Sequence, residues 1–223
     1  MQSEDREIIE QVKPYSMQTR IRIYSLLRAV EYVIEQKIPG DFVECGVWRG
    51  GGMMAIALKL VKMGIKDRYL RLYDTFEGMS SPKRVDVQSR TGISAQALLD
   101  EDLTKSSGIW AVASLNEVRQ NMLATKYPIE NCDFVKGDVS QTLTQVATDP
   151  ICLLRVDVDW HEPTQRCLRY LYPRLSANGI FISDDYGHWA GAKLAVDEYF
   201  SGLQEAPLLT PVDNDCVMGQ KPA

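Results

Sequence analysis

The sequence predicts an α/β fold, in which a doubly wound, mostly parallel sheet of seven strands is preceded by an N-terminal helical cap. Short apolar runs alternate along the chain with segments whose hydrophobic residues recur near helical spacing. Such alternation is typical of a parallel sheet covered by helices on both faces. With 223 residues, 45% of them hydrophobic, the chain is expected to form a single domain with one core.

The first half of the chain sets this pattern. Residues 20–36 predict an amphipathic helix, because their apolar residues lie near helical spacing and Pro39-Gly40 provides a stop beyond them. Residues 41–46 predict a strand that ends in a glycine turn, and the apolar segment 52–60 continues as a helix. The repeating unit continues with a strand at 69–74 and a helix at 115–126.

The second half of the chain repeats this unit. It predicts strands over residues 133–136, 151–158 and 179–183, and helices over residues 140–147, 163–175 and 190–200. The tail has two short apolar runs, 207–209 and 216–218, which predict an antiparallel hairpin at the sheet edge. We divide the chain into a helical cap, residues 1–39, and a main domain, residues 40–223, with a variable insertion at 79–113.

Composition and charge exclude several classes of protein. The formal net charge is -5 and the basic residues are spread along the chain, so nucleic acid is not an expected partner. No apolar run approaches the roughly 18 residues of a membrane span, and the acidic N-terminus does not resemble a signal peptide. We therefore expect a soluble, cytoplasmic protein with no membrane partner. The five scattered cysteines form no C-x-x-C pair, which predicts buried, reduced thiols rather than disulfides or zinc ligands.

The residues that end the first three strands predict a nucleoside-like ligand, because open α/β sheets bind ligands beyond the carboxyl ends of their strands. The glycine-rich turn 44–52 lets backbone approach a ligand at a helix N-terminus, but Trp48 stands where a dinucleotide-binding turn needs glycine. Asp74 can accept hydrogen bonds from both hydroxyls of a ribose, and Asp138 ends the third strand. Glu44 disfavours a pyrophosphate and suits an ammonium group.

Each of these features also has an ordinary structural interpretation. A glycine-rich turn can be a simple tight connection between strand and helix. An aspartate after a strand is often a helix N-cap, and for Asp138 this interpretation is as good as ligand binding. Together the features favour a ligand that contains adenosine but no phosphate.

Four aspartates at the ends of two later strands predict a divalent-metal site. Asp157 and Asp159 are separated by one residue, so on a strand both side chains would point to the same side. Asp184 and Asp185 end the next strand, which is expected to lie beside the first. Four carboxylates so close repel one another unless a cation joins them, and oxygen ligands suit Mg²⁺ or Ca²⁺. The alternative is a set of solvated helix caps.

Two histidines and two tryptophans follow these aspartates closely in the chain. His161 and His188 could each act as a base, contact a substrate or be ordinary surface residues. Trp160 and Trp189 could exclude water from the site or simply pack in the core.

The order of these motifs resembles that of the macrocin O-methyltransferase family over nearly the whole chain. The resemblance rests on segments 40–51, 73–79, 137–138, 157–159 and 184–187. It implies the class I methyltransferase fold, which is Rossmann-like. It also implies transfer of a methyl group from S-adenosylmethionine, with Mg²⁺, to a hydroxyl of a deoxysugar or a phenolic natural product.

The resemblance further implies roles for individual residues. Ser16 and Met17 would fold over the cofactor. The residues near its methionine part would be Glu44, Cys45, Gly46, Val47, Trp48 and Gly50, and those around its ribose would be Asp74, Thr75, Phe76 and Gly78. Ser114, Gly137 and Asp138 would lie beside its adenine, and Asp157 would also hold the cofactor. The metal ligands would be Asp157, Asp184 and Asp185. Asp159 matches the position of the general base in phenol-methylating members, and His161 is a second catalytic candidate because it lies beside the acidic segment.

The implied reaction is an in-line transfer of the sulfonium methyl to a hydroxyl whose acidity the metal raises, while a nearby base removes the proton. The short N-terminus before Tyr15 and the segment 79–113 differ from the family. Both regions shape the acceptor pocket in relatives, so the acceptor does not carry over beyond a small molecule with a hydroxyl. Relatives also suggest a homodimer or a larger homo-oligomer.

The sequence allows two other functions. A nicotinamide-dependent oxidoreductase would share the fold and Asp74, but the chain lacks the required glycine and has no tyrosine followed four positions later by lysine. A non-catalytic subunit that binds a nucleoside or a metal is the other alternative. No interaction domain in the sequence supports it.

Overall fold

A seven-stranded sheet forms the centre of the chain, whose computed structural model describes residues 3–102, 104–106, 108–145 and 150–223. The strands are β1 (Asp41–Cys45), β2 (Leu70–Asp74), β3 (Cys132–Lys136), β4 (Ile151–Val156), β5 (Leu175–Ser183), β6 (Thr210–Pro211) and β7 (Val217–Gln220). Their order is β3-β2-β1-β4-β5-β7-β6. The first five run parallel, and β7 is antiparallel to both of its neighbours. The expected mostly parallel sheet is confirmed.

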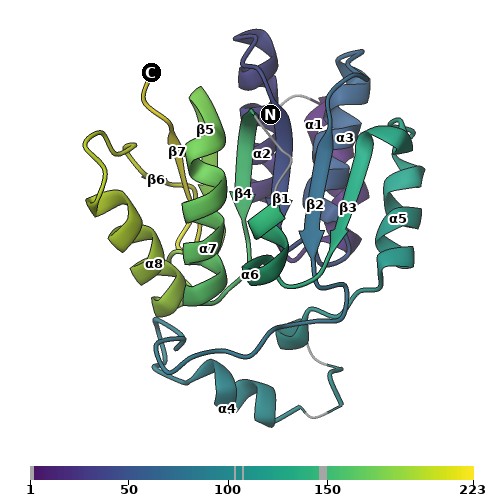
Figure 1. The fold of residues 1–223 in the computed structure, drawn as a ribbon. Coiled ribbons are helices and arrows are strands. Elements are labelled where there is room, and N and C mark those ends of the chain that lie inside the picture. The colour runs from purple at the N-terminus through teal and green to yellow at the C-terminus, as the bar shows by residue number, and fades with distance from the viewer. Residues whose placement is uncertain (1–2, 103, 107, 146–149) are drawn as a thin grey trace.

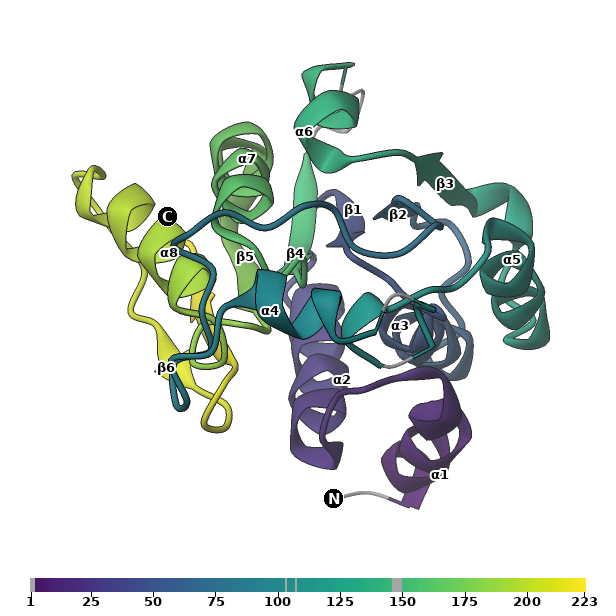
Figure 2. The same cartoon turned by 90° about the horizontal axis from the view of Figure 1, so that it is seen from below.

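Helices cover both faces of this sheet, as Figures 1 and 2 show. One face carries α1 (Ser3–Val12), α2 (Arg20–Glu35), α3 (Gly51–Lys62) and α5 (Leu115–Ala124), and the other carries α6 (Val139–Thr142), α7 (His161–Leu171) and α8 (Ala190–Ser201). Short 3-10 turns are η1 (Lys13–Tyr15), η2 (Gly108–Trp110), η3 (Ile129–Asn131), η4 (Leu143–Gln145) and η5 (Tyr172–Arg174). Strand β4 is buried along its whole length, because both of its faces are covered.

Several element boundaries differ from the expected ones. Strand β4 ends at Val156 rather than at residue 158, and β5 begins at Leu175 rather than at residue 179. Strand β6 begins directly after the apolar run 207–209, and β7 overlaps the run 216–218 and extends two residues beyond it. The helix expected over residues 140–147 is the short α6 followed by η4, and residues 146 and 147 lie outside the described part of the chain.

Helix α1 is not predicted by the spacing of hydrophobic residues, because most of its residues are polar. Its apolar residues Ile8, Ile9 and Val12 are buried in the same hydrophobic cluster as α2 and α3. Asp5 is buried as well, and its carboxylate lies 2.8 Å from the ammonium of Lys59 on α3. The described part of the cap thus packs into the core, while the division of the chain at residue 39 stays a prediction.

The carboxyl ends of β1 and β4 lie side by side at the point where the strand order reverses. Open α/β sheets bind ligands at such a point. The segment 79–113, which contains α4 (Ala95–Asp100), crosses beyond these strand ends (Figures 1 and 2). Gly46 allows the loop after β1 to approach the loop after β4, since a Cβ there would lie 1.7 Å from the carbonyl oxygen of Asp157. The fold therefore predicts a ligand site at this edge of the sheet.

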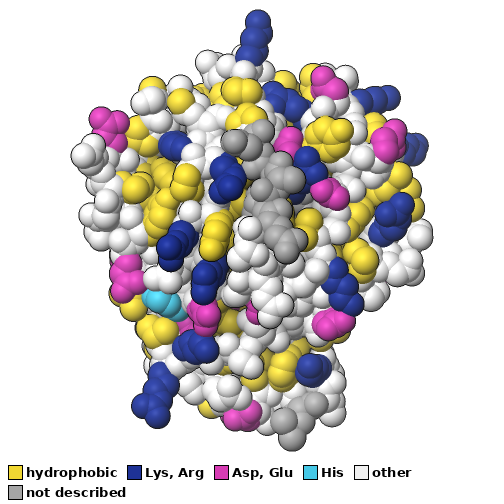
Figure 3. Space-filling view, viewed as in Figure 1, with side chains coloured by type: hydrophobic (Ala, Val, Ile, Leu, Met, Phe, Trp, Pro, Cys, Tyr) yellow, Lys and Arg dark blue, Asp and Glu magenta, His cyan; other side chains and the backbone are white. Residues whose placement is uncertain are grey.

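The surface and the cysteines can be compared with what composition predicts. On the face shown in Figure 3, lysine and arginine side chains are interspersed with acidic and hydrophobic ones. Within the described ranges, no helix combines the length and the apolar character that crossing a bilayer requires. The cysteines are all buried with free thiols, which confirms their expected burial.

Candidate functional site

Two adjoining cavities open at the carboxyl ends of the strands. The first has a volume of about 620 Å³ and is lined by segments that follow β1, β2, β3 and β4. The second has a volume of about 970 Å³ and extends from Glu44 to the segment after β5. Both open beyond the strand ends, where open α/β sheets bind small molecules. The residues that line both cavities are Met17, Trp48, Ala111, Asp157 and Asp159.

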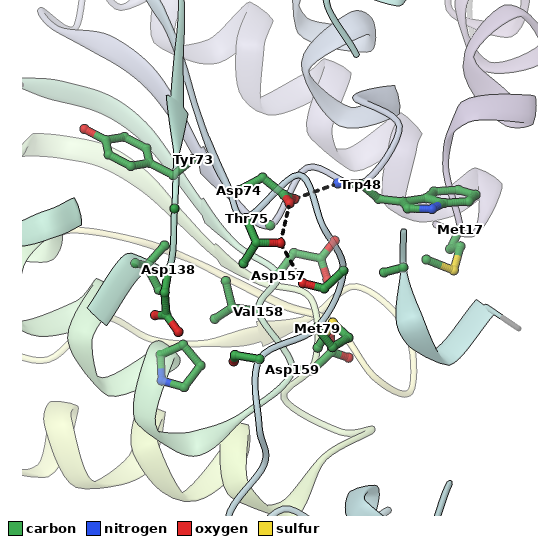
Figure 4. A pocket seen from close by; sticks show the side chains of 17 residues that line it. Met17, Trp48, Tyr73, Asp74, Thr75, Met79, Asp138, Asp157, Val158 and Asp159 are labelled. Carbon is green, nitrogen blue, oxygen red and sulfur yellow. Dashed lines mark hydrogen bonds between the residues drawn. The ribbon is translucent and has the colours of Figure 1, made fainter. Parts of the chain in front are cut away.

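The first cavity is organised around Asp74, which ends β2 (Figure 4). Its Oδ2 accepts hydrogen bonds from the backbone N–H of Val47 at 2.7 Å and of Trp48 at 3.0 Å. Its Oδ1 accepts from the N–H of Phe76 at 2.7 Å and from the hydroxyl of Thr75 at 3.4 Å. Burial raises the pKa of Asp74, and these N–H donors oppose that shift.

These bonds change the interpretation of Asp74. A carboxylate offers about four acceptor sites, and the three backbone N–H donors take up most of them. The single proton of the Thr75 hydroxyl also has the carbonyl oxygen of Gly78 as an acceptor, at the shorter distance of 2.6 Å. Asp74 therefore fixes the turns after β1 and β2 on either side of the cavity. Its expected bonds to both hydroxyls of a ribose would require some of these contacts to be exchanged.

The expected adenine side of the first cavity lies at the start of α6. Asp138 is the N-cap of this helix, since its Oδ1 accepts a hydrogen bond from the N–H of Ser140 at 2.7 Å. It also lines the cavity together with Gly137, so the structural and the ligand-facing interpretations both apply to it. Ser114 is the N-cap of α5, where its hydroxyl accepts from the N–H of Glu117 at 3.2 Å, and it lines neither cavity.

The other expected cofactor residues divide into two groups. Those that line one or both cavities are Ser16, Met17, Gly46, Val47, Trp48, Thr75 and Gly78. Those that line neither are Cys45, Gly50 and Phe76. Cys45 is buried within β1 and Phe76 is buried after β2, so both pack in the core next to residues that line the cavities.

A buried ion pair lies at one end of the second cavity. Glu44 of β1 is in register with Arg155 of β4, and their side chains are 1% and 2% exposed. Oε1 of Glu44 accepts a hydrogen bond from Nη1 of Arg155, whereas Oε2 has no hydrogen-bond partner. A Cβ on Gly52 would lie 2.5 and 2.9 Å from the two carboxylate oxygens, so only glycine leaves them accessible at the start of α3.

Three aspartates converge beside this ion pair. Asp157 follows β4, and Asp184 and Asp185 follow the neighbouring strand β5. One carboxylate oxygen from each lies within 4.8 Å of the other two. The three sequence-predicted metal ligands are thus brought together, because parallel neighbouring strands end at the same edge of the sheet.

Two arginines partly neutralise Asp157 and Asp184. Nη2 of Arg155 lies 2.7 Å from Asp157 and 2.8 Å from Oδ1 of Asp184. Arg22 of α2 lies 2.7 Å from Oδ2 of Asp184. The carboxylates that line the second cavity are Glu44, Asp157, Asp159, Asp184 and Asp185. When all five are ionised, the two guanidinium groups do not balance them, and the excess of negative charge would attract a cation.

Burial also shifts the protonation of this cluster. It raises the pKa of Asp157 to about 6, against the opposing effect of Arg155. Burial, aided by the charge of Asp157, raises the pKa of Asp159 to about 7. Burial and then the charge of Asp159 raise the pKa of Asp185 well above its usual range. A bound cation would favour the charged forms of all three groups.

Asp159 shares this space with Asp157, but not because side chains alternate along a strand. Strand β4 ends before both residues, and Asp159 lies in the left-handed region with a φ of 60°. Its Oδ1 accepts a hydrogen bond from Nε1 of Trp189 at 2.7 Å, and its N–H donates to Oδ2 of Asp185 at 3.0 Å. A turn fixed by these bonds therefore aims the carboxylate.

The two histidines occupy different places. Nε2 of His161 lies 3.2 Å from a carboxylate oxygen of Glu198, and His161 lines neither cavity. His188 lines the second cavity and packs edge-on against Trp189, with ring centroids 4.9 Å apart. Burial lowers the pKa of His188, which favours a neutral imidazole. The structure thus brings Asp159 and His188 to the site, whereas His161 begins α7 outside it.

Sequence reasoning missed three charged residues. Arg155 left a signal, because an arginine inside an apolar strand needs a buried partner. Arg22 left none, since its partners are distant in the chain. Asp86, in the insertion, is fully buried, and it accepts hydrogen bonds from the N–H of Lys83 at 2.7 Å and of His161 at 2.8 Å. Asp86 thereby ties the insertion to the start of α7.

Comparison with solved structures supports this architecture. The structure of the O-methyltransferase NovP matches with a TM-score of 0.80 and 32% identity, over 94% of this chain and 83% of that one. CalS11, a calicheamicin methyltransferase, matches with a TM-score of 0.67 and 19% identity, over 99% of this chain and 93% of that one. The second likeness shows a common fold.

Sequence comparison identifies the family. The chain is 33% identical over 200 residues to demethyldecarbamoylnovobiocin O-methyltransferase of Streptomyces niveus, which covers 90% of this chain and 73% of the relative. It is 34% identical over 166 residues to 8-demethyl-8-(2,3-dimethoxy-alpha-L-rhamnosyl)-tetracenomycin-C 4'-O-methyltransferase of Streptomyces olivaceus, over 74% and 60% of the two chains. The Macrocin-O-methyltransferase (TylF) family matches residues 4–221. The chain therefore belongs to the macrocin O-methyltransferase family and is an S-adenosylmethionine-dependent O-methyltransferase, not an oxidoreductase or a non-catalytic subunit.

Proposed function

We propose that the chain methylates a hydroxyl of a small-molecule natural product, with Mg²⁺ held by Asp157, Asp184 and Asp185. The observation that carries the proposal is the convergence of one oxygen from each of these residues within 4.8 Å. Asp157 also lines the first cavity, so a cation on the three aspartates would lie next to the space for the nucleoside. Adjacent sites are what a reaction between cofactor and acceptor requires.

The donor set fits a hard divalent cation. All three candidate ligands are carboxylates, and oxygen ligands favour Mg²⁺ over softer metals. Oδ1 of Asp184 has no well-directed hydrogen bond, and its neighbour at 2.8 Å, Nη2 of Arg155, is shared with Asp157, so the oxygen could take a cation as a ligand. When bound, Mg²⁺ would stabilise the negative charge that develops on the acceptor oxygen.

The two cavities suit the two ends of the cofactor. The first cavity would hold the adenosine between the turn organised by Asp74 and the start of α6. In the second, the unpartnered Oε2 of Glu44 would accept the ammonium of the methionine part. Trp48 and Met17 line both cavities, and an aromatic face near the sulfur position suits a sulfonium cation.

Asp159 is our candidate for the group that takes the acceptor proton. Its carboxylate lines both cavities, and burial, with the charge of Asp157, raises its pKa to about 7, close to the value that suits a base at neutral pH. His188 is the second candidate, because it lines the same cavity and burial favours its neutral form.

The acceptor class rests on the relatives. Their names describe methylation of a novobiocin precursor and of a rhamnosyl group on tetracenomycin. We therefore propose a deoxysugar or phenolic hydroxyl as the acceptor, and we retain a homodimer or larger assembly as a prediction. The segment 79–113 and residues Ser16 and Met17 would shape the acceptor space.

Methyl transfer from radiolabelled S-adenosylmethionine tests the proposal. Metal-stripped protein is mixed with demethyldecarbamoylnovobiocin and a panel of phenols and deoxysugars, and turnover is expected only after MgCl₂ is added. Asp157→Asn should abolish this turnover with little loss of affinity for S-adenosylhomocysteine. The matched control is Asp197→Asn, which alters a surface ion pair with Lys193 and should leave the rate unchanged. Undiminished turnover in excess EDTA would exclude the role of the metal.

A further inference from the structure

One arginine connects the two functional parts of the second cavity. Nη1 of Arg155 pairs with Glu44, the proposed acceptor of the cofactor ammonium. Nη2 of the same guanidinium lies 2.7 Å from Asp157 and 2.8 Å from Asp184, which are proposed metal ligands. The arginine, Glu44 and Asp184 are 2%, 1% and 7% exposed, so little water screens these two contacts, whereas Asp157 is 29% exposed. A single positive charge thus serves both ligand positions.

The contacts of this arginine are incomplete. Nε and Nη2 of Arg155, Oε2 of Glu44 and Oδ1 of Asp184 are buried without hydrogen-bond partners. Nη2 is near both aspartates but does not form a well-directed hydrogen bond with either. Buried polar atoms in this condition cost free energy. Arg155 therefore neutralises the aspartates by proximity, and an incoming cation competes with it for them.

Arg22 cannot connect the two positions in this way. Its guanidinium is held by Asp184 at 2.7 Å, by Asp213 at 2.7 Å and by Asp215 at 3.2 Å. These partners keep it on the side of the cavity formed by α2 and the turn between β6 and β7. Arg155 alone of the two arginines contacts Glu44.

We propose that Arg155 is a shared counter-ion, through which the metal and the amino-acid end of the cofactor weaken each other's binding. The inference rests on the proposed function, because it takes Glu44 as the ammonium site and the aspartates as metal ligands. A divalent cation on Asp157 and Asp184 repels Arg155 towards Glu44, which is then less available to an ammonium group. When an ammonium group binds Glu44, Arg155 interacts more strongly with the aspartates, and this lowers their affinity for the metal. Linkage requires both effects to have the same size.

Calorimetry on the metal-stripped chain at constant ionic strength tests this antagonism. Saturating MgCl₂ should raise the Kd of S-adenosylhomocysteine by about fivefold or more, a size typical of coupling between sites. The Kd of 5'-methylthioadenosine should stay unchanged, because this probe has the same nucleoside and sulfur but no amino-acid part. An unchanged or lower Kd for S-adenosylhomocysteine overturns the proposal. Equal weakening of both probes also overturns it.

Two variants locate the effect. Glu44→Gln should weaken S-adenosylhomocysteine in EDTA and remove the effect of Mg²⁺ on its Kd. Asp138→Asn, which alters the far end of the cofactor space, is the matched control and should keep that effect. A full Mg²⁺ effect in Glu44→Gln overturns the role of the pair. Binding of both ligands without antagonism overturns this inference alone, whereas failure to bind either ligand overturns the proposed function with it.

Discussion

The two cavities use their carboxylates in opposite ways. In the first, Asp74 accepts three backbone N–H groups and Asp138 caps a helix, so the chain itself supplies the donors. In the second, Asp157, Asp184 and Asp185 face one another, and arginines contact Asp157 and Asp184. A carboxylate held by N–H donors needs no ligand, whereas facing carboxylates repel one another until a cation arrives. The first cavity is preorganised, and the second is completed by what it binds.

Removing a candidate metal ligand should have the largest effect. We expect Asp185→Asn to lower the affinity for Mn²⁺, used as a probe for Mg²⁺, by more than about 100-fold, because a charged oxygen ligand is lost. In EDTA the same variant should unfold at the same or a higher temperature, since it relieves repulsion among the aspartates. Electron paramagnetic resonance measures the affinity. A loss below threefold would remove Asp185 from the site.

Removing the carboxylate of Asp74 should instead cost stability. Asp74→Ala leaves the N–H groups of Val47, Trp48 and Phe76 without their charged acceptor. The expected loss is about 2 kcal/mol of unfolding free energy, measured by urea denaturation in EDTA. The matched variant Asp157→Ala should cost less under the same conditions. Equal losses would contradict the contrast between the two cavities.

Much of the fold was predictable, because strand and helix patterns are local. The alternating pattern and the tail hairpin predicted all seven strands, whose boundaries differ by a few residues. Helix α1 was not predictable in this way, since its apolar residues are only three, Ile8, Ile9 and Val12, among seven polar ones. The path of the insertion depends on tertiary contacts such as that between Asp86 and the start of α7, which no local pattern records.

The candidate site was predictable where topology decides it. Asp157, Asp184 and Asp185 follow neighbouring parallel strands, and this alone brings them together. His161 shows the limit of proximity in sequence, because the helix that it begins turns its side chain towards Glu198. Arg22 shows a second limit, since it bonds to Asp184 across 162 positions in the chain.

The pH dependence of stability should distinguish the metal-free and metal-bound forms. Burial raises the pKa of Asp157 to about 6 and that of Asp159 to about 7, so without metal the folded chain binds more protons than the unfolded chain between about pH 4 and pH 7. Stability in EDTA should therefore fall as the pH rises through this window. Mg²⁺ should raise the Tm at about pH 8 but hardly at about pH 5, where protons compete with it. Scanning calorimetry measures both, and a Tm in EDTA that rises with pH would contradict the assignment.

The smallest expected effect tests Asp159 as the base. Nε1 of Trp189 donates to its carboxylate at 2.7 Å and so opposes the burial that raises its pKa. Trp189→Phe keeps an aromatic ring but removes this donor, which should move the acid limb of the kcat/KM profile up by about one pH unit at saturating Mg²⁺. Trp160→Phe is the matched control, because its Nε1 donates to the carbonyl of Ser80 at 3.0 Å and not to a carboxylate. If the acid limb moves only in Trp189→Phe, Asp159 is the group whose proton uptake limits transfer. If it stays in place, Asp159 is not the base, and His188 is the remaining candidate.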